Sequence, residues 1–76
     1  MGAERGSDDV DQVVRSLAPQ VLAGLVRRRE DFAAAEDAVQ DAMVEALRVW
    51  PEHPPRDPRW WLTAVAVRRL VEARRS

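Results

Sequence analysis

The sequence predicts an all-α fold, a compact bundle of three main helices without a sheet. Apolar residues recur at three- and four-residue steps along most of the chain, which is the period of a helix with one buried face. No segment combines the two-residue alternation of a strand with flanking turn residues, and a proline-rich stretch separates the last two periodic segments. With 76 residues, the chain has room for one hydrophobic core.

The first helix is expected to begin at Ser7 or Asp8, since both residue types cap helix N-termini well. Residues 1–6 are then a flexible leader, and residues 7–76 form a single helical domain. Pro19 lies inside the apolar stripe, and because it lacks a backbone N–H we expect the helix to be kinked or split there. The stripe consists of Val10, Val13, Val14, Leu17, Val21, Leu22, Leu25 and Val26.

The second helix has the clearest apolar pattern and is expected to end before Pro51. Glu36 and Asp37 are expected in its first turn, where carboxylates interact favourably with the helix dipole. Several alanines in the stripe permit the close approach of a neighbouring helix. The stripe consists of Ala35, Ala38, Val39, Ala42, Met43, Ala46, Leu47 and Trp50.

Four of the five prolines lie between Pro51 and Pro58, so this stretch is expected to be a loop. Asp57 followed by Pro58 is typical of a helix start, with Asp as the cap and Pro at the first helical position. The third helix should run from Pro58 to about Arg74. Apolar residues cover most of its circumference, which is expected of a helix packed on more than one side.

Composition argues against several classes of protein. The chain has no cysteine and a single histidine, His53, so neither a disulfide nor a metal site is expected. It has no glycine-rich phosphate loop, and its titratable side chains fall on open helix faces, so we expect no cofactor and no enzymatic activity. No apolar run approaches the roughly 20 residues of a membrane helix. Without a signal peptide, the chain is expected to be cytoplasmic.

Charge is distributed unevenly although the net charge is only −1. Residues 30–45 contain six acids and no base, whereas residues 56–76 contain six arginines and two acids. Opposite charges on two surfaces predict two different partners. On the second helix, Asp37, Asp41 and Glu45 follow at four-residue steps and form an acidic edge that could receive a basic helix. An ordinary solvated helix face would show the same pattern.

The third helix carries a basic face with an aromatic residue at one end. Trp61, Arg68 and Arg75 recur every seven residues, and Glu72 lies on the same face. Arginines next to an aromatic ring are typical of surfaces that bind nucleic-acid backbone and unstacked bases. The alternative is a core tryptophan with solvent-exposed arginines. Trp60 and Trp61 point in directions about 100° apart, which makes it difficult to assign both to the core.

Two motifs resemble region 2 of bacterial extracytoplasmic-function (ECF) sigma factors. They are AEDAVQDAM at residues 35–43 and, after the proline-rich loop, WLTAVAVRRLVE at residues 61–72. The resemblance covers residues 13–75, nearly the whole chain. Ala-Gly-Leu at residues 23–25 and Pro-Arg-Asp-Pro at residues 55–58 are most similar to an ECF subgroup with large C-terminal extensions.

The resemblance implies a helical bundle that docks on the clamp helices, a coiled coil of the RNA polymerase β′ subunit. It also implies recognition and melting of the promoter minus-ten element, chiefly through its non-template single strand. The loop at residues 54–59 takes the position of the segment that captures an extruded base. The polymerase-binding positions are Asp37, Gln40, Asp41 and Met43. The DNA-binding positions are Arg56, Asp57, Arg59, Trp60, Trp61, Arg68, Glu72 and Arg75.

The sequence departs from the family pattern in several places. Met43 replaces the usual aromatic residue, Arg68 replaces Asn, and Glu72 replaces Asp. Trp61 fits the family position, so Trp60 is an additional tryptophan. No region 4 follows, so this chain is not expected to read the minus-thirty-five element, as in an excised domain or a truncated protein. An anti-sigma factor, or the rest of a longer chain, is a further candidate partner.

Two other functions fit the residues. One is a helical protein-interaction module, oligomeric or bound to an anti-sigma factor, with no DNA role; it predicts that Trp60 and Trp61 are both buried. The other is a helix-turn-helix protein that binds duplex DNA. A proline-rich stretch separates the last two helices, instead of the short turn of that motif, so this interpretation ranks last.

Overall fold

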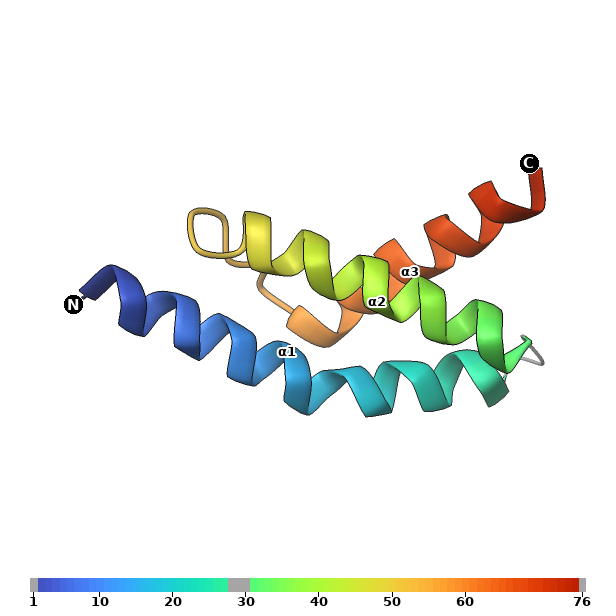
Figure 1. Ribbon diagram of the computed structural model, residues 1–76, viewed down its shortest axis with the longest axis horizontal. Coiled ribbons are helices and arrows are strands. Elements are labelled where there is room, and N and C mark those ends of the chain that lie inside the picture. The colour runs from blue at the N-terminus through green and yellow to red at the C-terminus, as the bar shows by residue number, and fades with distance from the viewer. Residues whose placement is uncertain (1, 28–30, 76) are drawn as a thin grey trace.

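The computed structural model describes the backbone of residues 2–27 and 31–75, and side chains from residue 9 onward within these ranges. It consists of three helices, α1 (Gly2–Arg27), α2 (Phe32–Val49) and α3 (Pro58–Arg75) (Figure 1). Helix α2 runs antiparallel to both α1 and α3, and no strand occurs within the described ranges. The predicted all-α bundle of three helices is confirmed.

Helix α1 is continuous, and Pro19 lies inside it. The helix axis changes direction near its middle, so the helix is bent rather than split (Figure 1). The bend is consistent with the missing N–H of Pro19, which removes one hydrogen bond from the helix. The helix begins at Gly2, before both expected caps, Ser7 and Asp8. Side chains of residues 1–8 lie outside the described part, and the division into a leader and a domain stays a prediction.

Helix α2 begins earlier than the sequence predicts. Its N-cap is Asp31, whose side chain accepts a hydrogen bond from the backbone N–H of Ala34 at 3.3 Å. The prediction that Glu36 and Asp37 lie in the first turn is therefore wrong, because the helix already starts at Phe32. An N-cap carboxylate satisfies an N–H that has no partner within the helix, which explains why the helix starts here.

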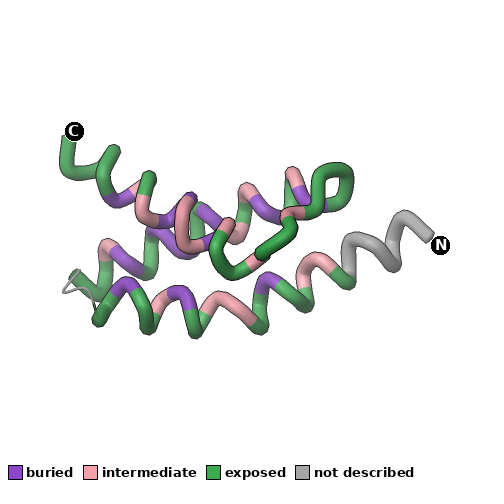
Figure 2. The backbone as a smooth tube through the Cα atoms, turned by 180° about the vertical axis from the view of Figure 1, so that it is seen from behind, coloured by how far each residue is buried: buried purple, intermediate pink, exposed green. Residues whose placement is uncertain are grey.

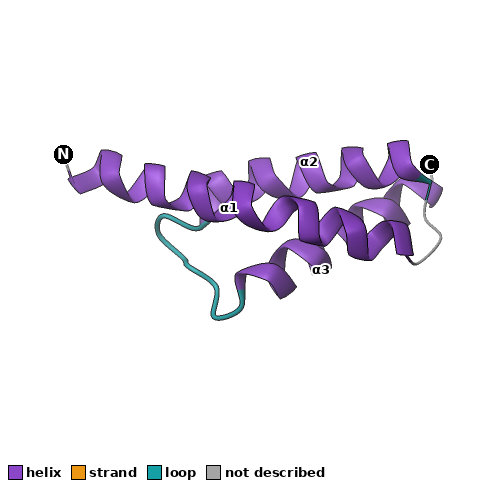
Figure 3. Ribbon diagram, turned by 90° about the horizontal axis from the view of Figure 1, so that it is seen from below, coloured by secondary structure: helices purple, strands orange, loops and turns teal. Residues whose placement is uncertain are grey.

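Helix α3 begins as predicted. The Asp57 carboxylate accepts a hydrogen bond from the N–H of Trp60 at 3.0 Å, and Pro58 occupies the first helical position. The loop before α3 follows the last turn of α2 and projects away from the helices in an extended conformation (Figure 3). The predicted loop and the predicted third helix are both confirmed, and the helix ends at Arg75.

The core lies between the three helices (Figure 2). Helix α2 occupies its centre and contributes four buried alanines that let both neighbours approach closely. Trp50, at the C-cap of α2, is only 4% exposed and forms the end of the core next to the loop. The buried residues are Val14, Val21, Leu25, Ala35, Ala38, Val39, Ala42, Ala46, Trp50, Leu62, Val65, Ala66 and Leu70. No helix in the described ranges is long and apolar enough to span a membrane.

Candidate functional site

The first turn of α3 presents an exposed tryptophan beside the loop. Trp60 is 68% exposed, and with Asp57, Arg59 and Thr63 it lines a surface pocket. The capping bond from Asp57 fixes the backbone at Trp60, while an Nη1 of Arg59 donates to the Gln20 side chain of α1 at 3.4 Å. An indole that is exposed but held at a fixed helix start can stack on a flat partner at a low cost in conformational entropy.

Trp61 points elsewhere. It is half-buried and packs against Trp50 with ring centroids 5.3 Å apart and ring planes at 76°, an edge-to-face contact. The two adjacent indoles therefore have different environments, as the helical rotation between neighbours requires. Trp61, which fits the family position for DNA binding, packs against the core, and the additional Trp60 is the more exposed of the two tryptophans.

Three of the four predicted polymerase-binding residues are exposed on α2. Asp37, Gln40 and Asp41 are exposed, and Met43 is half-buried. Gln40 and Met43 line an apolar groove between α1 and α2, to which Leu22 of α1 also contributes. Asp37 and Asp41 instead line a groove between α2 and α3. The four residues thus lie on both sides of the outer surface of α2. A partner that contacts all of them must reach from the α1–α2 groove over α2 to the α2–α3 groove.

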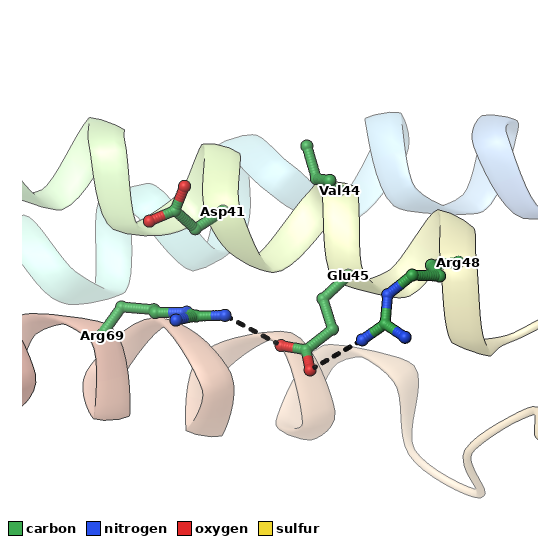
Figure 4. A pocket seen from close by; sticks show the side chains of 5 residues that line it. All are labelled: Asp41, Val44, Glu45, Arg48 and Arg69. Atoms are coloured by element: carbon green, nitrogen blue, oxygen red, sulfur yellow. Dashed lines mark ion pairs between the residues drawn. The ribbon is translucent and has the colours of Figure 1, made fainter.

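Glu45 does not lie on a free acidic edge. Its side chain is only 19% exposed and lies between α2 and α3, where it faces three arginines. Its carboxylate oxygens lie 3.6 Å from Arg48, 3.5 Å from Arg68 and 3.7 Å from Arg69 (Figure 4 shows the pairs with Arg48 and Arg69). The expectation that Glu45 continues the acidic edge is therefore wrong, because the arginines of α3 pair with it.

The acidic and basic surfaces consequently meet along the α2–α3 seam. A pocket on this seam is lined by Asp41, Val44, Glu45, Arg48 and Arg69 (Figure 4). The sequence predicts two separate charged surfaces, because helical periodicity does not reveal which residues of α3 pack against α2. Opposite charges at the seam also hold the two helices in register, although partly exposed pairs contribute only modestly to stability.

The other predicted DNA-binding residues lie around this seam and along the loop. Arg56 is exposed in the loop, and Arg75 is exposed at the end of α3. Glu72 pairs with Arg69, three positions earlier on the same helix, at 3.7 Å. Arg68 is exposed on α3 but its guanidinium reaches back to Glu45.

Sequence reasoning missed Arg48, Arg69 and Thr63. Arg69 stands out because its Nε atom is buried without a hydrogen-bond partner, although the terminal nitrogens pair with Glu45 and Glu72. A signal for Arg48 was present, since it follows Glu45 at a three-residue step that brings side chains together on a helix. In the described part of the chain, no group of three or more His, Asp or Glu side chains could hold a metal ion.

Comparison with known proteins identifies the family. The family described as Sigma-70 region 2 matches residues 13–76. The chain belongs to the sigma-70 region 2 family.

The domain is also similar to an uncharacterised protein of Rhizobium meliloti (strain 1021). The two are 40% identical over 57 residues, which cover 74% of this chain and 14% of the relative. The chain thus spans about one seventh of the relative's length. No solved structure gives a significant match.

Proposed function

We propose that this domain is the region 2 of an ECF-type sigma factor. It docks on the β′ clamp helices of RNA polymerase through α2 and binds the non-template strand of the minus-ten element through the loop and the start of α3. It acts without catalysis or cofactor, in the cytoplasm. The observation that carries the proposal is that exposed carboxylates on α2 and an exposed tryptophan on α3 belong to one small helical bundle.

The polymerase contact rests on the exposed side chains of α2. Asp37 and Asp41 are exposed on successive turns and have room beside them in the groove toward α3. A basic partner helix laid along this side gains charge pairs, and Met43 and the apolar groove beside it supply contact area. Electrostatic complementarity of this kind sets the orientation and the rate of association.

The DNA contact rests on Trp60 and the pocket next to it. Stacking of one base on an aromatic side chain contributes about 1–3 kcal/mol. Extruding a base from a duplex costs a few kcal/mol, so a preformed receptor that captures the extruded base favours melting. Arg56 and Arg59 lie on either side of the capping residue Asp57 and supply positive charge for the strand's phosphates.

The proposal is tested by reversing the charge on α2. Asp37→Arg combined with Asp41→Arg should abolish binding to a β′ clamp-helix fragment, because the two introduced guanidiniums would repel a basic helix that the carboxylates attract. The measurement is isothermal titration of the fragment, with circular dichroism to show that the variant remains helical. Both positions are exposed, so the bundle is expected to fold.

A matched control is Asp9→Arg combined with Glu52→Arg, which changes the net charge equally at exposed positions on α1 and the loop. This control should bind the fragment with an affinity close to that of the original chain. Equal affinity of the Asp37/Asp41 variant and the control would contradict docking through α2.

The alternative is a protein-interaction module without a DNA role. It predicts that both tryptophans of the first turn of α3 are buried, and the 68% exposure of Trp60 argues against it. The much greater length of the Rhizobium meliloti relative supports a further proposal, that the rest of a longer chain contacts this domain. An anti-sigma factor is the other partner that we propose for it.

A further inference from the structure

The charged cluster on the α2–α3 seam gathers three guanidiniums around one carboxylate, and the Asp41 carboxylate lines the same pocket. Three guanidiniums, from Arg48, Arg68 and Arg69, converge on the single carboxylate of Glu45, and Glu72 adds a second acid at Arg69. A guanidinium offers five N–H donors, whereas a carboxylate has about four acceptor positions. The acids therefore cannot saturate the donors of this cluster.

The distances indicate the same excess of donors. Charge-assisted hydrogen bonds between nitrogen and oxygen are typically about 2.7–2.9 Å long. The three pairs to Glu45 measure 3.5 to 3.7 Å, so one carboxylate lies near three guanidiniums without a short charge-assisted hydrogen bond to any of them. The Nε atom of Arg69 is buried without a hydrogen-bond partner.

The cluster also has space for a ligand. The pocket on the seam is lined by Asp41, Val44, Glu45, Arg48 and Arg69 (Figure 4). Arg48 reaches it from α2 and Arg69 from α3, so a small anion in the pocket would be held by both helices. The planar fork of a guanidinium matches the oxygens of a phosphate group, which makes a phosphate the best-fitting anion.

We propose that Arg48, Arg68 and Arg69 form a binding site for a backbone phosphate of single-stranded DNA, and that Glu45 occupies the site in the free protein. The assignment to DNA rests on the proposed function. A phosphate that enters displaces the Glu45 carboxylate from the guanidiniums. Glu45 therefore holds the three arginines together in the absence of DNA and lowers the affinity for phosphate.

Two variants with opposite expected effects test the proposal. Glu45→Gln removes the competing charge and should raise the affinity for a short single-stranded oligonucleotide about threefold. Arg48→Gln removes a phosphate contact and should lower it by a similar factor. The affinity should also depend less on salt in Arg48→Gln, with a logarithmic slope smaller by roughly 0.7. Fluorescence anisotropy of the full chain over a range of salt concentrations measures both quantities.

Matched controls separate the site from general electrostatics. Glu36→Gln removes the same charge from another side of α2, where Glu36 lines the groove with α1. Arg15→Gln removes the same charge from a side chain that is 74% exposed and paired with Asp11, as Arg48 is 73% exposed and paired with Glu45. If Glu45→Gln binds no more tightly than Glu36→Gln, or Arg48→Gln behaves like Arg15→Gln, the proposal is wrong.

The source of the phosphate is identified by nuclear magnetic resonance of the arginine Nε–H groups. Titration with the oligonucleotide should shift the signals of Arg48 and Arg69 but not that of Arg15, and inorganic phosphate should cause a weaker shift at the same residues. A response to inorganic phosphate without a response to the oligonucleotide would overturn the assignment to DNA. If the Glu45→Gln variant unfolds, Arg48→Gln still tests the proposal. Arg48 is exposed, so its substitution is expected to leave the fold intact.

Failure of this inference and failure of the proposed function give different results. If Trp60→Ala weakens oligonucleotide binding while Arg48→Gln does not, the first turn of α3 binds DNA and the seam does not. If the chain binds no oligonucleotide, alone or together with RNA polymerase core, the DNA role and the phosphate site are both wrong.

Discussion

Trp60 and Trp61 are neighbours in the chain but belong to two different regions of the molecule. Trp61 packs edge-to-face on Trp50 and closes one end of the core, whereas Trp60, rotated by about 100° around the same helical turn, is 68% exposed. The core side of this turn contributes to stability, and the exposed side is available for a ligand. Two adjacent residues of one helical turn thus have different roles, Trp61 in stability and Trp60 in the proposed binding of DNA.

The contrast depends on the end of α2 as much as on α3. Trp50 caps α2 and is 4% exposed, so the loop must bring the first turn of α3 back against it. The Asp57 cap fixes where that turn begins, and hence which of the two indoles faces Trp50. Changes to Trp50 and Trp61 should therefore affect the free energy of unfolding, while changes to Trp60 should affect binding.

The largest effect on stability is expected for Trp50→Ala. Removing a buried tryptophan costs about 3–5 kcal/mol, through lost burial and the cavity left behind. A domain of this size has only a few kcal/mol of stability, so the variant should be largely unfolded at room temperature. Urea denaturation followed by circular dichroism measures the change.

Trp50→Phe makes this prediction sharper. It keeps an aromatic edge against Trp61 and removes the Nε1–H group, which is buried without a hydrogen-bond partner. We expect it to cost much less than Trp50→Ala. Equal costs for the two variants would mean that the aromatic contact contributes little to the end of the core.

Much of the fold was predictable because its determinants are local. The apolar stripes, the loop and the start of α3 at Asp57 follow from residue spacing and from capping preferences. The start of α2 was placed too late, although Asp31 is a favourable cap residue directly before Phe32. Pro19 was expected to kink or split α1, and the remaining hydrogen bonds of a long helix keep it continuous with a bend.

Less of the candidate site was predictable, because it depends on contacts between helices. The exposure of Asp37, Gln40 and Asp41 follows from their place on an amphipathic helix. The pairing of Glu45 with Arg68 and Arg69 depends on the angle at which α3 crosses α2. Which of Trp60 and Trp61 is exposed likewise depends on the position of Trp50. The spacing of apolar residues in the sequence does not reveal that position.

An intermediate effect on stability is expected for Asp57→Ala, which removes the N-cap of the helical turn that contains both tryptophans. Loss of an N-cap side chain typically costs about 1 kcal/mol. The cost should appear in urea denaturation as a lower midpoint with an unchanged slope. Asp57→Asn keeps an oxygen that can accept the bond from the Trp60 N–H and should remain close to the original chain. If both substitutions are neutral, the cap does not determine the position of the turn.

The smallest effect on stability is expected for Trp60→Ala. Substitutions at exposed positions usually change the free energy of unfolding by less than about 0.5 kcal/mol. The same variant should weaken binding of single-stranded DNA by about 1–3 kcal/mol, the contribution of one stacked base. Phe32→Ala is a suitable control, because Phe32 is 56% exposed at the start of α2 and should change neither quantity. If Trp60→Ala lowers stability as much as Trp61→Ala, the two sides of the turn are not functionally distinct, and the exposed indole is part of the folded core rather than a binding surface.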